Sequence, residues 1–397
     1  MKQVIIFSTI FFLAGVISWA QKPEPIPGQY IVFLNESAAL PVIKHPGRSF
    51  NRLHGSDSVY RKQNITKLKE VRRRRNIAES KVLHEFADVL VGFSVRLTDA
   101  EVFALRKDKD VVSVRQDYVV NIGTTEIKQV NNNTKALPQT ESCAVTQAGG
   151  SSDGSLKYTW IWILDTGIDT THPDLNVQIN TPYMKSFTGE PVNDLHGHGT
   201  HVAGIAAAKN NDIGVVGVSA GAKVVPVKVL SNAGVGQTSW FIAGLDHVAM
   251  YDIPGDVVNM SFGGGVYLFC DLLIPEYGTA IRNLANVGTW IVMAAGNNGG
   301  EARFFLPGCI NGGRIITVGA IDCNNNCASF SNFGSNVDYV TVGVNVYSTY
   351  KNGTYATLSG TSMATPIVAG ILHQLNNYPL SRGVINCKGD NYKIATR

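Results

Sequence analysis

The chain has 397 residues, of which 44% are hydrophobic and 16% are charged. This length exceeds one average domain, although a single large α/β domain could account for most of it. The formal net charge of +4 is too small to indicate binding to nucleic acid.

Residues 1–20 have the pattern of a secretory signal peptide. Lys2 supplies the positive start, residues 4–16 are apolar, and Ser18 and Ala20 are small residues suited to cleavage. The apolar run is shorter than the ~20 residues that a membrane-spanning helix needs. We therefore predict a secreted, extracellular protein that keeps no membrane anchor after cleavage.

Residues 21–121 have the pattern of a small α/β domain. Segments rich in Val and Ile predict strands at 30–34, 89–95 and 111–120. The polar stretch 61–86 has spaced apolar residues and predicts at least one helix. A further helix begins after Thr98, where Glu101 three residues later completes a capping box.

The first helical stretch contains four consecutive arginines, Arg72 to Arg75. A basic run of this kind is usually a solvated helix face. We therefore predict that these four side chains are exposed.

Residues 157–397 follow a linker-like segment, 122–156, that is rich in Asn, Gly and Ser. The strands predicted after it are 160–164, 223–230, 256–260, 289–294 and 314–318. The predicted helices are 201–208, 240–251, 279–285 and 362–375. This alternation predicts an α/β fold in which helices cover both faces of a doubly wound, largely parallel sheet.

Three polar residues, Asp165, His198 and Ser362, occupy positions suited to catalysis. Asp165 follows an apolar strand, His198 lies in a run of small residues, and Ser362 begins an apolar helix. A serine hydroxyl is a weak nucleophile that needs a base, and the base needs an orienting group. Backbone N–H groups at a helix start can also stabilise a developing negative charge.

The three motifs, in this chain order, resemble the subtilisin family of serine proteases and most closely its proteinase K-like branch. The resemblance implies that Ser362 is the nucleophile, that His198 is the base, and that Asp165 orients the base. His196 and His201 are then neighbours without that role. A single Asp-Thr-Gly also occurs in aspartic proteases, but those need a second copy, which this sequence lacks.

The same resemblance implies an oxyanion hole and a peptide-binding cleft. Asn297, at the end of an apolar strand, would donate its side-chain N–H to the oxyanion beside the Ser362 N–H. The residues expected to bind the substrate are Gly234, Gly236, Ser261, Phe262, Gly263, Gly264, Ala294, Ala295 and Gly296. These residues carry no charge, so we predict broad specificity that favours an apolar or aromatic residue before the cut, unlike a kexin-like enzyme.

The N-terminal domain resembles the inhibitor-like propeptide of the family, which has a small ferredoxin-like α/β fold. The resemblance implies that residues 21–121 help the protease to fold and then block its cleft, with their last residues lying there like a cleavage product. We predict a maturation cut between residues 121 and 128. The mature enzyme is expected to be a monomer that acts on proteins and peptides.

Calcium is the cofactor that the resemblance implies, in a structural role and not in catalysis. The proteinase K-like pattern places it at Asp338 with the backbone carbonyls of Gly313 and Ile315. The alternative is that Asp338 only ends a turn.

Six cysteines indicate an oxidising compartment. Many pairings are possible, and spacing alone does not decide between them. The predicted pairs are Cys143 with Cys387, Cys270 with Cys309, and Cys323 with Cys327.

The sequence as a whole predicts a secreted serine endopeptidase that is made as a self-processing precursor. One alternative is a secreted peptide-binding or inhibitory protein whose N-terminal domain never leaves the cleft. Another is an enzyme of the same architecture that mainly transfers acyl groups. An active protease should shed residues 21–121 by itself, whereas a binding protein should keep them.

Overall fold

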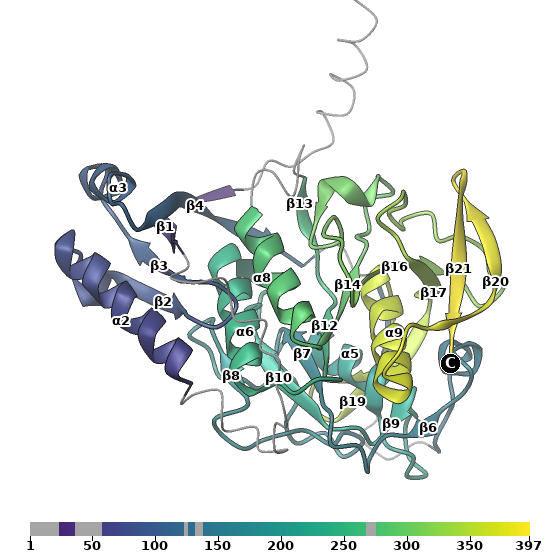
Figure 1. Cartoon of the computed structure of the whole chain (residues 1–397). Coiled ribbons are helices and arrows are strands. Elements are labelled where there is room, and N and C mark those ends of the chain that lie inside the picture. Colours follow the sequence, from purple (N-terminus) through teal and green to yellow (C-terminus); the bar gives the residue numbers. More distant parts are fainter. Residues whose placement is uncertain (1–23, 36–57, 123–125, 132–137, 267–274) are drawn as a thin grey trace, which may run out of the picture.

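The computed structural model describes residues 24–35, 58–122, 126–131, 138–266 and 275–397. Within these ranges the chain forms a small N-terminal domain and a large α/β domain that pack against each other (Figure 1). The predicted signal peptide, residues 1–20, lies outside the described residues. No helix in the described part is both long and apolar enough to cross a bilayer.

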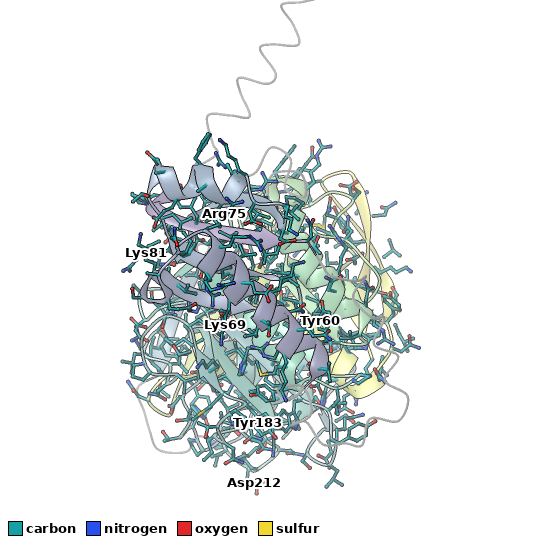
Figure 2. All side chains as sticks on the ribbon, turned by 60° about the vertical axis from the view of Figure 1, so that its left-hand side comes forward. Tyr60, Lys69, Arg75, Lys81, Tyr183 and Asp212 are labelled. Atoms are coloured by element: carbon teal, nitrogen blue, oxygen red, sulfur yellow. A yellow bond between two sulfur atoms is a disulfide. The ribbon has the colours of Figure 1, made fainter. Side chains whose placement is uncertain are left out.

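The N-terminal domain is an antiparallel sheet with two helices. Its elements are β1 (Glu24–Leu34), α2 (Val59–Arg74), β2 (Val82–Phe86), β3 (Gly92–Arg96), α3 (Asp99–Arg106) and β4 (Val111–Asn121). This β-α-β-β-α-β order is that of a ferredoxin-like fold, as predicted. Val32, Leu68 and Phe93 belong to a core that is separate from that of the large domain. Figure 2 shows α2 across the front of this domain, with Lys69 on it.

The stretch 61–86 contains the predicted helix, α2, which ends at Arg74. It also contains β2, a strand that the prediction did not include and that pairs antiparallel with β3. The predicted capping box is present: Thr98 accepts from the Glu101 N–H, and the Thr98 N–H donates to the Glu101 carboxylate at 2.8 Å.

The predicted exposure of the arginine run is wrong for Arg72, which is fully buried. Its guanidinium donates to Glu79 and Glu85 at 3.0 and 2.6 Å and lies 5.3 Å from the centroid of the Phe93 ring. The two carboxylates balance its charge and the ring covers its face, so burial is tolerated.

The large domain is built, within the described residues, on a nine-stranded sheet. Its order is β20 (Leu380–Cys387), β21 (Asp390–Thr396), β17 (Tyr339–Val342), β16 (Ile315–Ile321), β14 (Trp290–Ala294), β12 (Val257–Met260), β7 (Ile161–Asp165), β10 (Val224–Lys228) and β8 (Lys185–Ser186). All neighbours run parallel except β20, which pairs antiparallel with β21. Every strand predicted for this domain is present, and the largely parallel sheet is confirmed.

Helices cover both faces of the sheet, because alternate residues of a strand point to opposite sides. The helices are α5 (His198–Ala207), α6 (Thr238–Tyr251), α8 (Pro275–Asn286) and α9 (Thr361–Leu375). Ile161 and Ile163 of β7 lie in the core that α5 and α9 share. Trp162 and Leu164 lie in the opposite core, with α6 and α8, where Phe86 of the N-terminal domain also packs. The doubly wound arrangement is therefore confirmed, and the N-terminal domain covers the α6 and α8 side (Figure 1).

Segment 122–156 contains more regular structure than the linker that its composition predicts. The elements here are β5 (Glu126–Asn131), α4 (Cys143–Gln147) and β6 (Ser152–Asp153). β5 pairs with β19 (Thr354–Ser359), which pairs with β18 (Val346–Tyr350), and β6 pairs with β9 (Ser219–Ala220). The partner strands lie far along the chain, so local composition does not reveal them.

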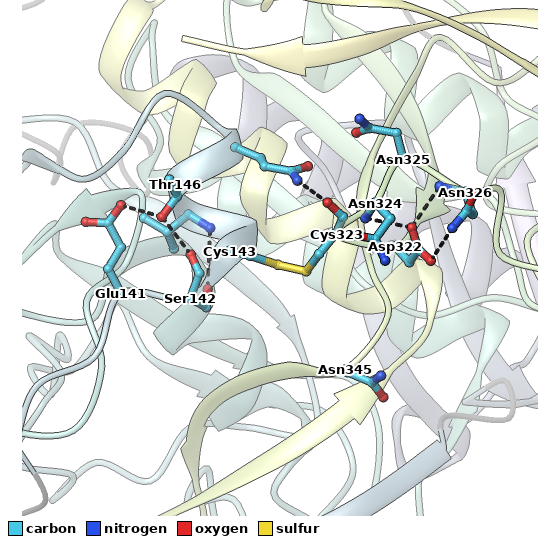
Figure 3. The surroundings of a disulfide bond; sticks show 12 residues. Glu141, Ser142, Cys143, Thr146, Asp322, Cys323, Asn324, Asn325, Asn326 and Asn345 are labelled. Carbon is cyan, nitrogen blue, oxygen red and sulfur yellow. Dashed lines mark hydrogen bonds between the residues drawn. A yellow bond between two sulfur atoms is a disulfide. The ribbon is translucent and has the colours of Figure 1, made fainter.

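The disulfides also differ from the prediction. The bonds join Cys143 to Cys323 and Cys327 to Cys387, so the predicted Cys143–Cys387 and Cys323–Cys327 pairs are wrong. The α4 helix holds Cys143 beside Cys323, whose carbonyl accepts from Gln147 at 2.6 Å (Figure 3). In the third predicted pair, Cys309 is disulfide-bonded and Cys270 lies outside the described residues.

Candidate active site

Asp165 and His198 meet at the carboxyl edge of the large sheet. Asp165 is the last residue of β7 and is fully buried, and its Oδ1 accepts the Thr166 N–H at 2.7 Å. His198 is the first residue of α5, and its Nδ1 lies 2.8 Å from the same Oδ1. Such a carboxylate favours the tautomer with the proton on Nδ1 and leaves Nε2 as the base. Among the described residues, no hydrogen bond reaches Nε2.

α5 can begin this close to Asp165 because residue 199 is glycine. A Cβ atom there would lie 2.1 Å from the Gly167 carbonyl oxygen and 3.1 Å from the Cβ of Asp165. A larger residue would therefore push the helix away from the strand end. The Gly199 N–H instead donates to Thr166 Oγ1 at 3.0 Å, which fastens the helix start to this strand end.

Ser362 is the second residue of α9, and Asn297 holds the start of that helix. Asn297 follows β14, and its Oδ1 accepts from the backbone N–H and the Oγ1 of Thr361, both at 2.8 Å. The Nδ2 of the same amide lies beside Gly360, where an added Cβ would be 3.1 Å from it. The Asn297 amide and the start of α9 therefore lie together, as an oxyanion hole requires.

The end of the N-terminal domain lies between the two predicted substrate-binding edges. β4 pairs antiparallel with β11 (Val235–Gln237), and the Ile122 N–H donates to the Gly234 carbonyl at 2.8 Å. On the other side is β13 (Gly264–Val266), where a Cβ on Gly264 would lie 2.8 Å from the Asn121 carbonyl oxygen. The backbone of Asn121 and Ile122 thus lies in the place expected for a substrate peptide.

The remaining predicted substrate residues contribute backbone more than side chains. Gly236 pairs with Val120 of β4, so its backbone faces the cleft. Ser261 Oγ accepts from the Asn259 amide at 2.8 Å, and Phe262 stacks on Phe241 in the core, so neither side chain faces a ligand. Ala294 and Ala295 are buried, whereas Gly263 and Gly296 are partly exposed.

The two histidines next to His198 have other surroundings. His201 is fully buried, and its Nε2 lies 3.1 and 3.0 Å from the carbonyl oxygens of Val346 and Ala356. Burial lowers the pKa of His201 to about 3, so it stays neutral and ties α5 to β18 and β19. Burial, and then the proximity of His198, lowers the pKa of His196. Of these three histidines, His198 is the one that contacts Asp165, as the sequence predicts.

The contacts of the residues predicted to bind calcium do not separate a calcium site from an ordinary turn. Asp338 is exposed as a residue, but its Oδ2 accepts the Thr317 N–H at 2.8 Å and burial raises the pKa of its carboxyl to about 6. Gly313 has no atom within 4 Å of the place where its Cβ would be, and Ile315 is buried. The contact of Asp338 is also compatible with a residue that ends a turn, so this site stays a prediction.

Two buried carboxylates that the sequence analysis did not single out fasten the N-terminal domain to α6. Asp246 Oδ1 accepts the backbone N–H groups of residues 87, 88 and 89 at 2.9, 2.7 and 3.0 Å. Asp117, at the end of the N-terminal domain, accepts the Ser239 N–H at 3.1 Å where α6 begins. Burial raises the pKa of both carboxyls. The only signal in the sequence is that Asp246 interrupts an apolar helical run.

These contacts describe an α/β protein with an Asp–His pair at a sheet edge, a serine at the start of a helix that packs against the helix of that histidine, and a peptide strand beside a sheet edge. A model of the subtilase family matches residues 157–381, and a model of peptidase inhibitor I9 matches residues 29–122. The chain belongs to the subtilase family and is a subtilisin-like serine endopeptidase with an I9 inhibitor domain at its N-terminus.

Similar proteins cover most of the chain. Subtilisin E from Bacillus subtilis (strain 168) is 34% identical over 316 residues, which are 78% of this chain and 77% of that protein. M-protease from Shouchella clausii (strain KSM-K16) is 37% identical over 294 residues, which are 74% of this chain and 70% of that protein. A solved structure of a cold adapted subtilisin-like serine proteinase matches with a TM-score of 0.53 and 29% identity, over 62% of this chain and 91% of that one. The subtilisin-like assignment is confirmed, and the proteinase K-like branch stays a prediction.

Proposed function

We propose that this chain is a secreted precursor whose mature part cleaves peptide bonds with Asp165, His198 and Ser362. The observation that carries the proposal is the 2.8 Å contact between His198 and Asp165, with Ser362 at the start of α9, which packs against α5. The pairing of β4 with β11 adds support, because a peptide strand already lies where a substrate would.

In the proposed reaction, Ser362 Oγ attacks the carbonyl carbon of the substrate and passes its proton to His198 Nε2. Asn297 Nδ2 and the Ser362 N–H stabilise the negative charge on the former carbonyl oxygen. His198 then gives the proton to the leaving amine, and water hydrolyses the acyl-enzyme by the same steps. Asp165 stabilises the charged imidazole throughout. One preoriented oxyanion donor is typically worth ~3–4 kcal/mol of transition-state stabilisation.

The N-terminal domain would inhibit the enzyme until it is cut off. Its chain leaves β11 at Ile122 and pairs with β19 from Glu126, whose register partner is Ser359. Ser359 lies shortly before Ser362, so the Glu126 end of the interval 122–126 lies near the start of α9, while its Ile122 end lies at Gly234. We place the maturation cut in that interval, inside the range 121–128 that the sequence predicts.

The proposed specificity is broad and leans towards apolar residues. The residues of β4 that pair with β11 include Val119 and Val120. The walls expected to face the residue before the cut, Gly263 and residues 294–296, carry no charge. We further propose that the protein is secreted through the signal pattern of residues 1–20 and that the mature enzyme is a monomer.

A structural calcium ion belongs to the proposal, and Asp174 fits it better than Asp338. Asp174 is fully buried, its Oδ2 accepts the Val215 N–H at 3.0 Å, and its Oδ1 has no hydrogen-bond partner among the described residues. Burial raises the pKa of Asp174 to about 6, as it does for Asp338, so full burial and the Oδ1 without a partner are what favour Asp174. The Tyr355 hydroxyl donates to the same Oδ2 at 3.3 Å. Ca²⁺ prefers such oxygen donors and would balance the buried charge.

Intact mass of the secreted wild type and of Ser362→Ala tests the proposal. Loss of the N-terminal domain in the wild type alone would establish a self-processing protease, and the new N-terminus would define the cut. Retention of the domain in both proteins would instead support a binding protein with a permanently filled cleft. Equal trimming in both would show that another protease makes the cut.

A further inference from the structure

Lys228 is a buried cation beside the proposed triad. It is the last residue of β10 and pairs in register with Asp165, the last residue of β7. Its side chain is fully buried, although an ammonium group inside a protein is costly unless partners compensate its charge. A lysine in this place is therefore expected to make contacts that an apolar residue could not.

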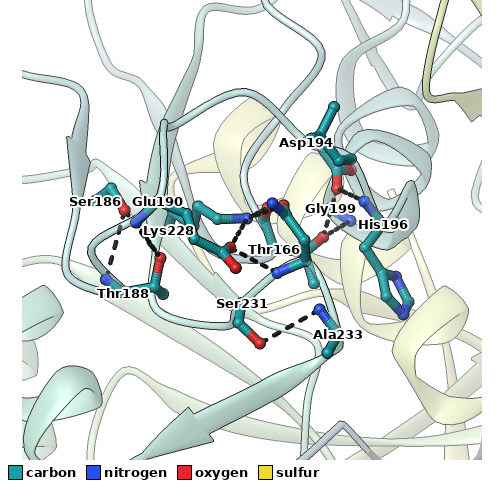
Figure 4. A network of polar contacts seen from close by, with 12 residues as sticks. Thr166, Ser186, Thr188, Glu190, Asp194, His196, Gly199, Lys228, Ser231 and Ala233 are labelled. Atoms are coloured by element: carbon teal, nitrogen blue, oxygen red, sulfur yellow. Dashed lines mark hydrogen bonds and ion pairs between the residues drawn. The ribbon is translucent and has the colours of Figure 1, made fainter.

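The partners of Lys228 lie on three different segments (Figure 4). Its Nζ donates to the carbonyl oxygen of Thr166, in the turn after Asp165, and to Asn232 Oδ1 at 2.9 Å. The Glu190 carboxylate lies 3.6 Å from Nζ and accepts the Asn232 N–H at 2.7 Å. Lys228 thus joins the turn of Asp165 to the loop of Asn232, which leads into β11.

Asp194 fastens the same turn to the start of α5. Its Oδ1 accepts from Thr166 Oγ1 at 2.9 Å and from the N–H groups of His196 and Gly197 at 3.0 and 2.8 Å. Its Oδ2 accepts from Thr200 Oγ1 at 2.7 Å. Thr166 therefore contacts a buried carboxylate through its hydroxyl and a buried ammonium through its carbonyl, and the two charges hold the turn from two sides (Figure 4).

We propose that Lys228 is a positioning residue that couples the substrate-binding edge β11 to the triad through the turn of Asp165. This inference rests on the proposed function, because it gives Lys228 a part in that same site. An extended peptide pairs with β11 and so depends on both groups of Lys228 contacts. A short ester that does not reach β11 depends only on the contact with the Asp165 turn.

The charge of Lys228 has a second consequence. The charged groups around it are Asp165 on β7, Glu190 after β8 and Asp194 before α5. Burial lowers the pKa of Lys228, and these three carboxylates oppose the lowering. A cation near the triad disfavours protonation of the base and an anion favours it. Loss of the Lys228 charge should therefore move the acid limb of the pH profile of kcat/KM to higher pH. Asp194→Asn should move this limb to lower pH.

The test compares Lys228→Met with Asn232→Ala, which removes only the contact on the loop side. Lys223→Met, just before the same strand, is the control, because the Lys223 ammonium lies over the Trp160 ring, 5.8 Å from its centroid. Active sites are counted by titration with a sulfonyl fluoride, and kcat and KM are measured for an extended peptide and for a single-residue ester. Lys228→Met should lower kcat/KM about tenfold or more for the ester, and further for the peptide. Asn232→Ala should mainly raise KM for the peptide.

The proposal is overturned if Lys228→Met keeps the wild-type ratio of peptide to ester kcat/KM and if its kcat/KM falls at the same acidic pH as in the wild type. This holds even if the variant has lost thermal stability. If Lys228→Met does not fold, Lys228→Gln keeps a donor without the charge and must show the shifted acid limb. If neither variant folds, an unchanged peptide KM in Asn232→Ala overturns the proposal. Failure of the proposed function would look different, because the wild type itself would not react with the sulfonyl fluoride.

Discussion

The N-terminal domain and the C-terminal hairpin of β20 and β21 are attached to the large domain in different ways. The hairpin continues the main sheet, since β21 pairs with β17, and Cys387 is bonded to Cys327. The last residue, Arg397, donates its N–H to the Ala148 carbonyl at 2.8 Å. The N-terminal domain has its own core, contains no cysteine, and pairs with the short strand β11.

This difference shows which kinds of contact suit the C-terminal hairpin, which remains in the mature enzyme, and which suit the N-terminal domain, which is expected to be released. A domain with its own core can separate without losing the contacts that fold it. Its attachment depends on apolar residues such as Phe86 that pack against α6 and α8, on backbone N–H groups that reach Asp246, on the contact of Asp117 with α6, and on a strand pairing that a substrate could replace. The hairpin shares its sheet and a covalent bond with the large domain, so its release would require unfolding.

The largest expected effect on release of the N-terminal domain comes from disabling the proposed triad. Asp165→Asn removes the charge that stabilises the imidazolium and favours the wrong tautomer of His198, so kcat should fall about 10⁴-fold. The N-terminal domain should then stay covalently attached, which the intact mass of the secreted protein measures. The exposed Asp212→Asn is the control and should process like the wild type. Normal processing of Asp165→Asn would remove Asp165 from the triad.

The next largest effect concerns only the C-terminal hairpin. Replacing Cys327 and Cys387 by Ala removes a bond that joins residues with a sequence separation of 60. The chain-entropy model assigns such a closure ~4 kcal/mol of unfolding free energy. Denaturant unfolding of the mature enzyme should show this loss, whereas release of the N-terminal domain after the cut should keep its wild-type rate. A matching change in the release rate would show that the two attachments are coupled.

A smaller effect concerns only the release of the N-terminal domain. Asp246→Ala removes the acceptor of three backbone N–H groups and one partner of Arg61. Hydrogen bonds to charged groups contribute ~1.5–3 kcal/mol, so release after the cut should be about 10- to 100-fold faster. The lag before activity appears measures this rate, and Asp212→Ala is the surface control. An unchanged lag would mean that apolar contacts such as that of Phe86 hold the domain instead.

The sequence predicts the large sheet and the candidate site where the signal is local. Asp165 and Asn297 each end an apolar run, and Ser362 begins one, so a strand end or a helix start is visible in the sequence itself. The chain order of Asp165, His198 and Ser362 then links them. The structure brings Asp165 to His198 and Asn297 to the start of α9 at the same sheet edge.

The errors arise where contacts with another segment, near or far along the chain, decide the structure. Val82–Phe86 is a strand because β3 lies beside it, which periodicity does not show. The cysteine pairs depend on where α4 and β20 pack. Lys228 looks like an ordinary polar residue of an apolar strand, and only its contacts with Thr166 and Asn232 give it a role.

The smallest expected effect is a dependence of N-terminal-domain docking on pH. His84, on β2, lies against Phe187 of the large domain, with 5.6 Å between the ring centroids. Burial, and then Lys185, lowers the pKa of docked His84 from its ordinary 6.5 to about 4. The released domain therefore binds more protons. Its docking is strongest above pH 6.5 and weakens as the pH falls towards 4, by about tenfold at pH 5.5.

Asp246 acts in the opposite direction, because burial raises its pKa and a docked state that binds a proton gains stability as the pH falls. The contribution of His84 is therefore measured as a difference between wild type and His84→Gln. The release rate at pH 5.5 divided by that at pH 7.5 should be about tenfold smaller in His84→Gln than in the wild type. Equal ratios in the two proteins would show that protonation of His84 does not help to detach the N-terminal domain.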